Sequence, residues 1–158
     1  MYKLLAWLTD YLSERTHYTV VNGVFSDKAK VTFGIPQGSV LGPTLFTLYA
    51  NDLPGAITTG TVYMYVDDTT IFCITETVDK VAEQLNKALK ELNIWCQENS
   101  LVPHPTKYEG MILKRSKFIG PLPSLRLGNN VVKWVTDTRL IGVTLDHELT
   151  WTKHLLGL

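Results

Sequence analysis

The sequence predicts an α+β fold, in which helices and strands are mixed but do not alternate regularly. Helical patterns lie beside runs of β-branched and aromatic residues, and the C-terminal third holds only short strand patterns divided by turns. The chain has 158 residues, enough for one domain of ordinary size, and contains no internal repeat, low-complexity segment or linker. We therefore expect residues 1–158 to form a single domain.

Composition gives little direct information about function. Hydrophobic residues make up 45% and charged residues 19% of the chain, which is typical of a globular protein and excludes a disordered one. The 15 basic and 15 acidic residues cancel, so net charge alone does not indicate nucleic-acid binding. Cys73 and Cys96 lie in apolar runs and are expected to be reduced core thiols of an intracellular protein in the cytoplasm or nucleus.

The N-terminal part shows three expected elements. Residues 2–13 carry leucines at helical spacing, and Asp10 interrupts them too early for a signal peptide or membrane span. Residues 18–21 and 30–33 are β-rich and predict a hairpin whose tip is either Asn22-Gly23 or Ser26-Asp27. Residues 39–53 predict a helix with Ser39 as N-cap and Pro54-Gly55 as its stop.

The remaining two thirds predict a hairpin, a long helix and several short strands. Residues 61–66 and 69–74 are β-branched and aromatic, with Asp67 and Asp68 between them, and residues 77–98 form an amphipathic helix that includes Trp95 as a core residue. A further strand is expected in residues 107–114. Residues 124–145 then predict a small antiparallel sheet.

Asp67 and Asp68 are the first candidates for chemistry. Neighbouring residues of a strand point to opposite faces, so two adjacent carboxylates converge only at a turn, where they can hold Mg²⁺ together with phosphates and water. A pair of aspartates is also common in solvated turns that have no function. The apolar runs on both sides are expected to be buried and to deliver the acids to a covered surface.

The second candidate is the segment GIPQGSVLGP at residues 34–43. Its three glycines and two prolines predict a fixed backbone path that a ligand can approach closely, next to the start of a helix. A plain strand-to-helix loop explains the glycines and prolines equally well. It leaves Gln37 unexplained.

These two segments together resemble reverse transcriptases. GIPQGSVLGP followed by YVDD at residues 65–68 is similar to the family pattern, and the likeness extends to residues 45–54, 95–99 and 140–151. It points to the non-long-terminal-repeat (LINE-type) retrotransposon enzymes and covers residues 4–154. The resemblance implies a polymerase palm with part of the fingers, acting as an RNA-directed DNA polymerase that adds deoxynucleotides to a DNA primer on an RNA template.

The resemblance also implies roles for individual residues. Asp67 and Asp68 would be catalytic ligands of two Mg²⁺ ions, which stabilise the attacking and leaving oxygens. Lys107 would approach the triphosphate as a proton donor, although an exposed lysine without function is the commoner case. Nucleotide and template contacts would come from Pro36, Gln37, Gly38 and Tyr65, and a primer grip from Leu140, Ile141 and Gly142, with residues 136–158 beginning the junction to the thumb.

The sequence departs from the family pattern in several places. The family's third carboxylate lies on an N-terminal palm strand upstream of the part that matches residues 1–13, so this strand and the thumb are expected to be missing. The chain would then supply only part of the ligands of the two metal ions. We therefore expect it to be inactive by itself, and its status as an enzyme is open. The alternative is a non-catalytic nucleic-acid-binding remnant of a retrotransposon. Three single positions also differ from the usual residue of the family: Val66 replaces an alanine, His104 an asparagine and Tyr108 a threonine.

Overall fold

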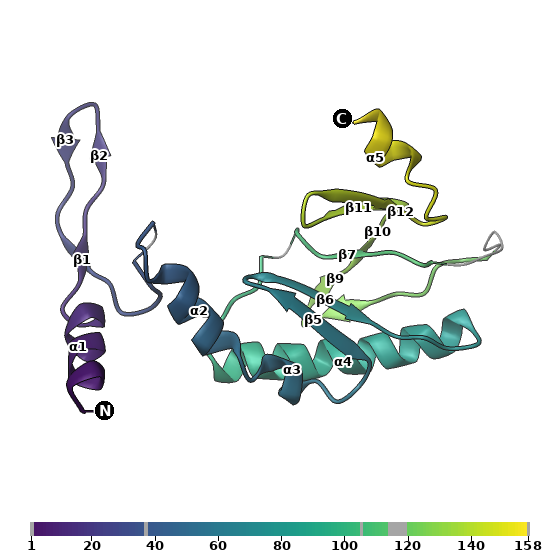
Figure 1. The fold of residues 1–158 in the computed structure, drawn as a ribbon, viewed down its shortest axis with the longest axis horizontal. Helices are drawn as coiled ribbons and strands as arrows, with labels where there is room; N and C mark the ends of the chain where they lie inside the picture. The colour runs from purple at the N-terminus through teal and green to yellow at the C-terminus, as the bar shows by residue number, and fades with distance from the viewer. Residues whose placement is uncertain (1, 37, 105, 114–119, 158) are drawn as a thin grey trace. The chain divides into compact units, whose positions relative to one another are not determined.

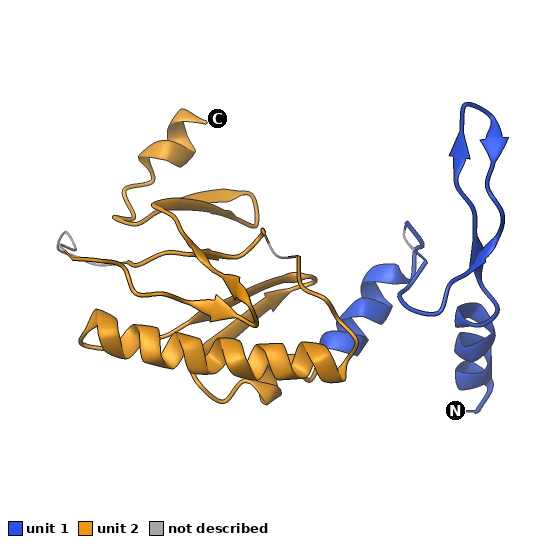
Figure 2. Cartoon of the chain, turned by 180° about the vertical axis from the view of Figure 1, so that it is seen from behind, with its two compact units in different colours: residues 1–51 blue, residues 52–158 orange. Residues whose placement is uncertain are grey.

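The structure is a computed structural model that describes residues 2–36, 38–104, 106–113 and 120–157. The chain divides into two compact units, Met1–Asn51 and Asp52–Leu158, which Figure 2 shows in blue and orange. The mixture of helices and short strands agrees with the predicted α+β class. The expectation of a single domain stays a prediction.

The first unit contains a helix followed by a two-stranded ribbon (Figure 1). Its elements are α1 (Tyr2–Leu12), β1 (Thr16–His17), β2 (Val20–Val21), β3 (Val24–Phe25) and β4 (Ala29–Lys30). Strand β1 pairs with β4, and β2 pairs with β3, both antiparallel. Asn22 and Gly23 form the tip with φ angles of 50° and 80°, as a type I′ turn requires, so the first of the two expected turns is the right one.

The helix expected over residues 39–53 is wrong in its extent. Helix α2 spans only Gly42–Ala50, and the separate short helix α3 spans Leu53–Ala56 in the second unit. Ser39 is not the N-cap, because Leu41 occupies that position without a side-chain cap. Successive turns occupy the backbone up to Gly42, whose amide donates to Ser39 O at 3.1 Å. The expected stop at Pro54 lies inside α3, where the first turn of a helix tolerates proline.

The long helix α4 (Val78–Glu98) organises the second unit and confirms the helix expected over residues 77–98. Thr77 is its N-cap, and the Thr77 side chain accepts a hydrogen bond from the Lys80 amide. Trp95 is 4% exposed, as expected for a core residue. A core cluster forms where α4 meets the C-terminal strands, and consists of Ala82, Leu125 and Val132 with the half-buried Leu85, Leu89, Tyr108 and Trp134.

The strands of the second unit are short and form separate pairs. They are β5 (Thr61–Tyr65), β6 (Asp68–Phe72), β7 (Glu109–Gly110), β8 (Arg126–Leu127), β9 (Asn130–Val131), β10 (Lys133–Trp134), β11 (Asp137–Leu140) and β12 (Val143–Asp146), followed by helix α5 (Thr152–Leu156). The expected antiparallel sheet is therefore only partly right, because β7 and β10 pair in parallel while β8–β9 and β11–β12 are antiparallel hairpins. The strand expected over residues 107–114 is reduced to β7 among the described residues.

An asparagine joins α4 to the edge of β8. Asn86 Nδ2 donates to Ser124 O at 3.0 Å, and Asn86 Oδ1 accepts from the Arg126 amide at 3.0 Å. The side chain thus serves as a hydrogen-bonding partner for the strand backbone.

No helix among the described residues is long and apolar enough to cross a membrane.

The two cysteines differ in burial. Cys96 on α4 is 5% exposed and Cys73 is half-buried, and both are free thiols. Burial raises the pKa of both thiols, which keeps them protonated. The expectation of a core thiol is met fully for Cys96 and in part for Cys73.

Candidate functional site

The hairpin that carries the two aspartates forms as expected. Strands β5 and β6 pair antiparallel, with Tyr65 opposite Asp68 at the end of the ladder. Val66 and Asp67 are the two residues of the turn, and Val66 alone of them has a positive φ, of 56°. Left-handed backbone is unfavourable for a β-branched residue and is often found at functional sites. Asp67 therefore lies in a tight and locally strained turn, and Asp68 directly follows it at the start of β6.

One face of this hairpin is exposed, which corrects the expectation that its strands are buried. Tyr63 and Tyr65 are 61% and 60% exposed, whereas Val62 and Met64, on the opposite face, are half-buried. The two-stranded hairpin contacts α3 and α4 but has no second layer among the described residues, so the alternation of side chains leaves one face open. On this open face the rings of Tyr63 and Phe72 stack at 5.5 Å with an interplanar angle of 6°.

Glu91 of α4 binds the segment that leads into β5, which we call the base of the hairpin. Glu91 Oε2 accepts hydrogen bonds from the Thr58 and Thr59 amides at 2.7 and 3.2 Å, and Glu91 Oε1 accepts from their hydroxyls at 2.9 and 3.3 Å. Burial alone would raise the pKa of Glu91, but these hydrogen bonds outweigh it and lower the pKa, so the carboxylate stays ionised. The next residue, Gly60, leads directly into β5.

Gly60 allows the two strands to meet closely at this base. Its φ is 83°, and a Cβ at this position would lie 2.8 Å from Cys73 Sγ and 2.9 Å from Phe72 O. Only glycine fits such an approach. Sequence reasoning missed both Glu91 and Gly60, because neither lies in a recognisable motif.

The aspartate pair suits part of a magnesium site. Both carboxylates are exposed at the turn, and no hydrogen bond or ion pair engages either of them among the described residues. Two hard carboxylate oxygens from adjacent residues are ligands that Mg²⁺ accepts, with phosphate and water completing its shell. The described part of the chain contains no group of three acidic, histidine or cysteine side chains placed to hold a metal. The residues present therefore fit Mg²⁺ as a partial ligand set.

The loop at residues 34–43 belongs to the first unit. Gly34 and Gly38 both have φ of 77°, and no atom lies within 4 Å of a Cβ built on either, so the glycines are required by backbone conformation rather than by space. The Ser39 amide donates to Pro36 O at 3.2 Å, which closes a turn around the middle of the loop. Pro36 is half-buried and Gly38 exposed, while Gln37 lies outside the described residues.

Lys107 is exposed and lies two residues before β7. Its amide donates to His104 O at 3.2 Å in a turn, and its neighbour Tyr108 packs into the core cluster, where burial raises the pKa of the phenol. Tyr108 thus fills a core position. The side chain of the preceding residue, Lys107, is exposed.

The residues expected to grip a primer form the tip of the β11–β12 hairpin. Leu140 pairs with Val143, and Ile141 and Gly142 form the turn with φ angles of 47° and 80°. Ile141 is 57% exposed at this tip. Leu140, Ile141 and Gly142 are therefore brought together on one tight, partly apolar turn.

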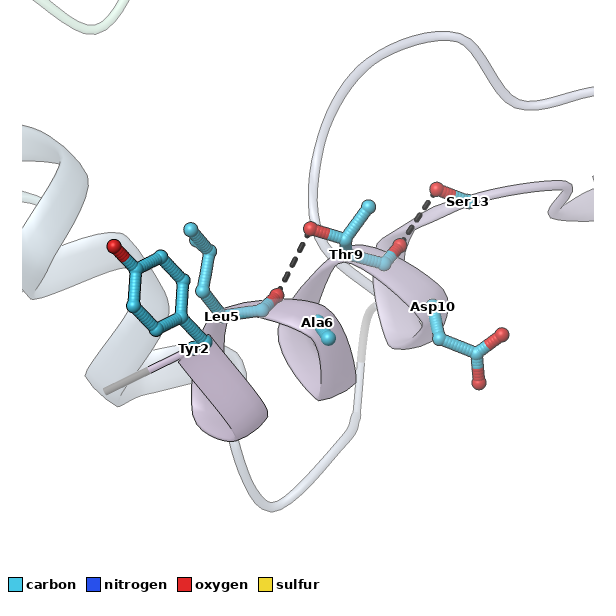
Figure 3. A pocket seen from close by; sticks show the side chains of 6 residues that line it. All are labelled: Tyr2, Leu5, Ala6, Thr9, Asp10 and Ser13. Atoms are coloured by element: carbon cyan, nitrogen blue, oxygen red, sulfur yellow. Dashed lines mark hydrogen bonds between the residues drawn. The ribbon is translucent and has the colours of Figure 1, made fainter.

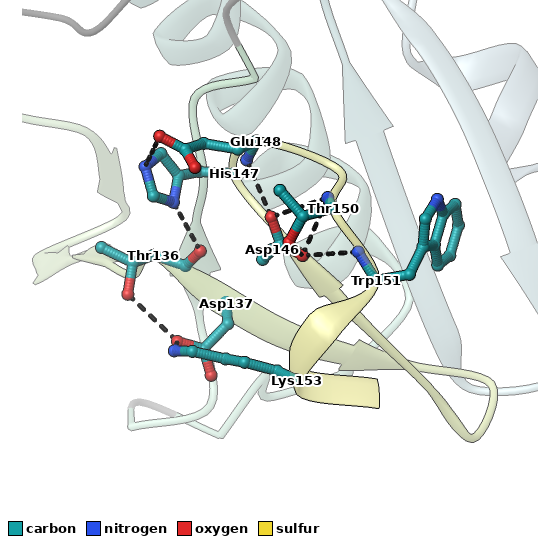
Figure 4. Close-up of polar contacts among 8 residues, drawn as sticks. All are labelled: Thr136, Asp137, Asp146, His147, Glu148, Thr150, Trp151 and Lys153. Atoms are coloured by element: carbon teal, nitrogen blue, oxygen red, sulfur yellow. Dashed lines mark hydrogen bonds and ion pairs between the residues drawn. The ribbon is translucent and has the colours of Figure 1, made fainter. Parts of the chain in front are cut away.

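The other end of this hairpin carries a buried carboxylate, Asp146, which lies in the segment that resembles the family but for which the sequence indicated no role (Figure 4). Asp146 is 7% exposed and accepts hydrogen bonds from the amides of Glu148, Thr150 and Trp151 and from the Thr150 hydroxyl. The Thr150 amide makes the largest contribution to lowering the pKa of Asp146. Lys153 pairs with Asp137 on β11, so α5 is held to the hairpin by polar contacts.

Two surface hollows of the described residues are lined by none of the expected site residues. One lies along α1 and is lined by Tyr2, Leu5, Ala6, Thr9, Asp10 and Ser13 (Figure 3). The other lies beside the start of α4 and is lined in part by Thr75, Glu76, Ile112 and Leu113.

Comparison with known proteins gives one consistent result. The family model "Reverse transcriptase (RNA-dependent DNA polymerase)" matches residues 2–145. The RNA-directed DNA polymerase from mobile element jockey of Drosophila melanogaster is 26% identical over 155 residues, which cover 94% of this chain and 17% of that polymerase. The probable RNA-directed DNA polymerase from transposon BS of the same species shows the same identity and coverage.

A third relative, the jockey polymerase of Drosophila funebris, is 25% identical over 167 residues and covers 99% of this chain and 18% of its own length. The chain thus spans less than a fifth of the length of the curated relatives it matches. No solved structure gives a significant match.

Proposed function

The chain belongs to the reverse transcriptase family, and on this premise we propose that it supplies palm residues for RNA-directed DNA synthesis in a non-long-terminal-repeat (LINE-type) retrotransposon. The observation that carries the proposal is the exposed tip of the β5–β6 hairpin, where Asp67 lies in the two-residue turn and Asp68 is the first residue of β6. Adjacent carboxylates at such a tip are suited to a reaction at phosphate.

In this proposal, Asp67 and Asp68 hold Mg²⁺ and the other residues position the substrates. The bound ions supply charge stabilisation at the attacking and leaving oxygens of an in-line phosphoryl transfer. Tyr65, opposite Asp68 and 60% exposed, contacts the primer end or the incoming deoxynucleoside triphosphate. Lys107 is exposed and able to donate a proton to the leaving phosphate.

Two further turns are assigned to nucleic acid. Pro36, Gln37 and Gly38 contact the nucleotide and the template base, supported by the open backbone at Gly38. Leu140, Ile141 and Gly142 grip the DNA primer, supported by the exposed apolar side chain of Ile141 at the hairpin tip. The partners in this proposal are an RNA template, a DNA primer and deoxynucleoside triphosphates.

We also propose that the 158-residue chain does not polymerise by itself. The two aspartates form only part of a ligand set, and the family resemblance implies a third carboxylate. A decisive experiment grafts this chain into the jockey polymerase in place of its matching segment and measures Mg²⁺-dependent primer extension. The chimera is expected to extend a primer and the isolated chain is not.

Variants of the graft identify the residues responsible. Asp67→Asn and Asp68→Asn are expected to abolish extension by the chimera, whereas Asp27→Asn, an exposed acid of the ribbon, is expected to leave it unchanged. Extension by the Asp67→Asn chimera would refute the proposed catalytic role. Extension by the isolated chain would refute its proposed inactivity and leave the chemistry supported.

A second candidate function is nucleic-acid binding without catalysis. The exposed stack of Tyr63 and Phe72 favours it, because aromatic rings on an open strand surface can stack on bases whatever their sequence. Salt-dependent RNA binding by the isolated chain, combined with an inactive chimera, would favour this candidate.

A further inference from the structure

Arg15 lies where helix α1 ends and the ribbon begins. Glu14 has a φ of 48°, a left-handed conformation that terminates the helix and turns the chain. Arg15 is half-buried, and its Nε donates to Leu12 O at 2.9 Å. The last carbonyls of a helix have no helical partner and carry the negative end of its dipole, so a guanidinium is well matched to this place.

The same guanidinium reaches the loop at residues 34–43. Arg15 Nη2 donates to Gly34 O at 2.5 Å, across 19 positions of sequence. The main chain of Arg15 adds a third link, because its carbonyl accepts from the Val31 amide at 2.9 Å. Arg15 therefore joins three places: the end of α1, the end of the ribbon and the first residue of the loop.

The rest of the loop is held by short-range contacts. The Ser39 amide donates to Pro36 O and the Gly42 amide to Ser39 O, each spanning three residues. These turns shape the loop locally but do not fix where it starts. The left-handed backbone of Gly34, with φ of 77°, and the hydrogen bond from Arg15 to its carbonyl together hold that start.

From this geometry we propose that Arg15 is a positioning residue, which sets the path of the loop that carries Pro36 and Gly38. The inference rests on the proposed role of this loop in contacting the nucleotide and template. A planar guanidinium donates to two carbonyls at once in fixed directions, whereas a lysine ammonium is a point charge on a flexible stem. Lysine at this position therefore keeps the charge and loses the geometry.

The first test is hydrogen exchange of the Ser39 and Gly42 amides in the purified chain. Arg15→Lys and Arg15→Ala are expected to speed exchange of both amides about tenfold, as for loss of one hydrogen bond to a charged group. The matched control Lys28→Ala removes an equal charge from the exposed turn after β3 and is expected to change neither amide. Unchanged exchange in Arg15→Lys would overturn the proposal. If Arg15→Ala does not unfold cooperatively and is therefore not properly folded, the result for Arg15→Lys alone decides the test.

The second test separates positioning from direct contact with nucleic acid. Affinity of the chain for an RNA–DNA primer–template is measured as a function of salt. For Arg15→Lys we expect about tenfold weaker binding with an unchanged salt slope, and for Lys28→Ala no change in affinity. A slope reduced by about 0.9 in Arg15→Ala would mean that Arg15 contacts a phosphate itself, and would overturn the proposal.

The remaining outcomes are also decisive. Faster amide exchange with unchanged affinity would overturn the positioning role. If the unsubstituted chain binds no primer–template, the proposed role of the loop fails, and the exchange experiment still decides whether Arg15 holds it.

Discussion

Trp95 Nε1 donates a hydrogen bond of 3.1 Å to Asp52 Oδ1. The bond joins the C-terminal half of α4 to the residue that precedes α3, across 43 positions of sequence. Trp95 is 4% exposed, and a buried indole N–H needs an acceptor, which Asp52 supplies. The segments around Asp52 and Trp95 both resemble the family, and their side chains meet in the structure.

The Trp95–Asp52 bond is expected to stabilise the second unit measurably. Trp95→Phe keeps most of the apolar packing and removes the donor, and should lower the free energy of unfolding by about 1–2 kcal/mol. Asp52→Ala should cost a similar amount. In a double-mutant cycle followed by urea denaturation, the two effects should be coupled by about 1 kcal/mol. Simple additivity of the two changes would show that the bond contributes nothing.

Gly60 offers a sharp test of the hairpin base. Gly60→Ala places a methyl group 2.8 Å from Cys73 Sγ and 2.9 Å from Phe72 O, at a φ of 83°. We expect a loss of at least about 2 kcal/mol, from steric overlap and left-handed strain together. Gly55→Ala is the control, because α3 has helical backbone and no atom lies within 4 Å of the new methyl group. Thermal unfolding should show Gly55→Ala as neutral or slightly stabilising.

The strain at Val66 predicts a stabilising substitution. Val66→Gly relieves the left-handed conformation at φ 56° and should raise the free energy of unfolding by up to about 1 kcal/mol, after the entropy of glycine is included. Chemical denaturation of the chain checks the sign. Destabilisation by more than about 1 kcal/mol would show that packing of the Val66 side chain outweighs the strain.

Asp146 predicts how stability depends on pH. Its pKa is lowered in the folded state, above all by the Thr150 amide, so the ionised form stabilises the fold. This contribution is complete above the unfolded pKa of about 3.9 and is lost as the pH falls through the lower folded value. Asp146→Asn should therefore be less stable at neutral pH and show a shallower loss of melting temperature on acidification. Thr150→Val removes only the hydroxyl donor. Its melting temperature at neutral pH should lie between those of the unsubstituted chain and Asp146→Asn.

Much of the fold was predictable because it follows from local pattern. The apolar spacing of residues 77–98 indicates a helix, Asn22-Gly23 suits a tight turn, and β-branched runs on both sides of Asp67 and Asp68 indicate a hairpin. The boundaries of α2 and α3 were not predictable in the same way. The turns before Gly42 and the break near Asn51 depend on backbone contacts that apolar spacing does not record.

The family, the order of the main elements and the place of the two aspartates at a hairpin tip could be read from the sequence, because these depend on residue types at short spacing. Which hairpin face is open, how β7 pairs with β10, and which side chains hold the turns in place depend on long-range contacts in the folded chain. Arg15 with Gly34, Glu91 with Thr58, and the Asp146 cluster bring polar groups to backbone atoms whose position depends on the folded chain. Such contacts leave no periodic signal, since a single polar residue looks the same in sequence whether it is solvated or buried against a turn.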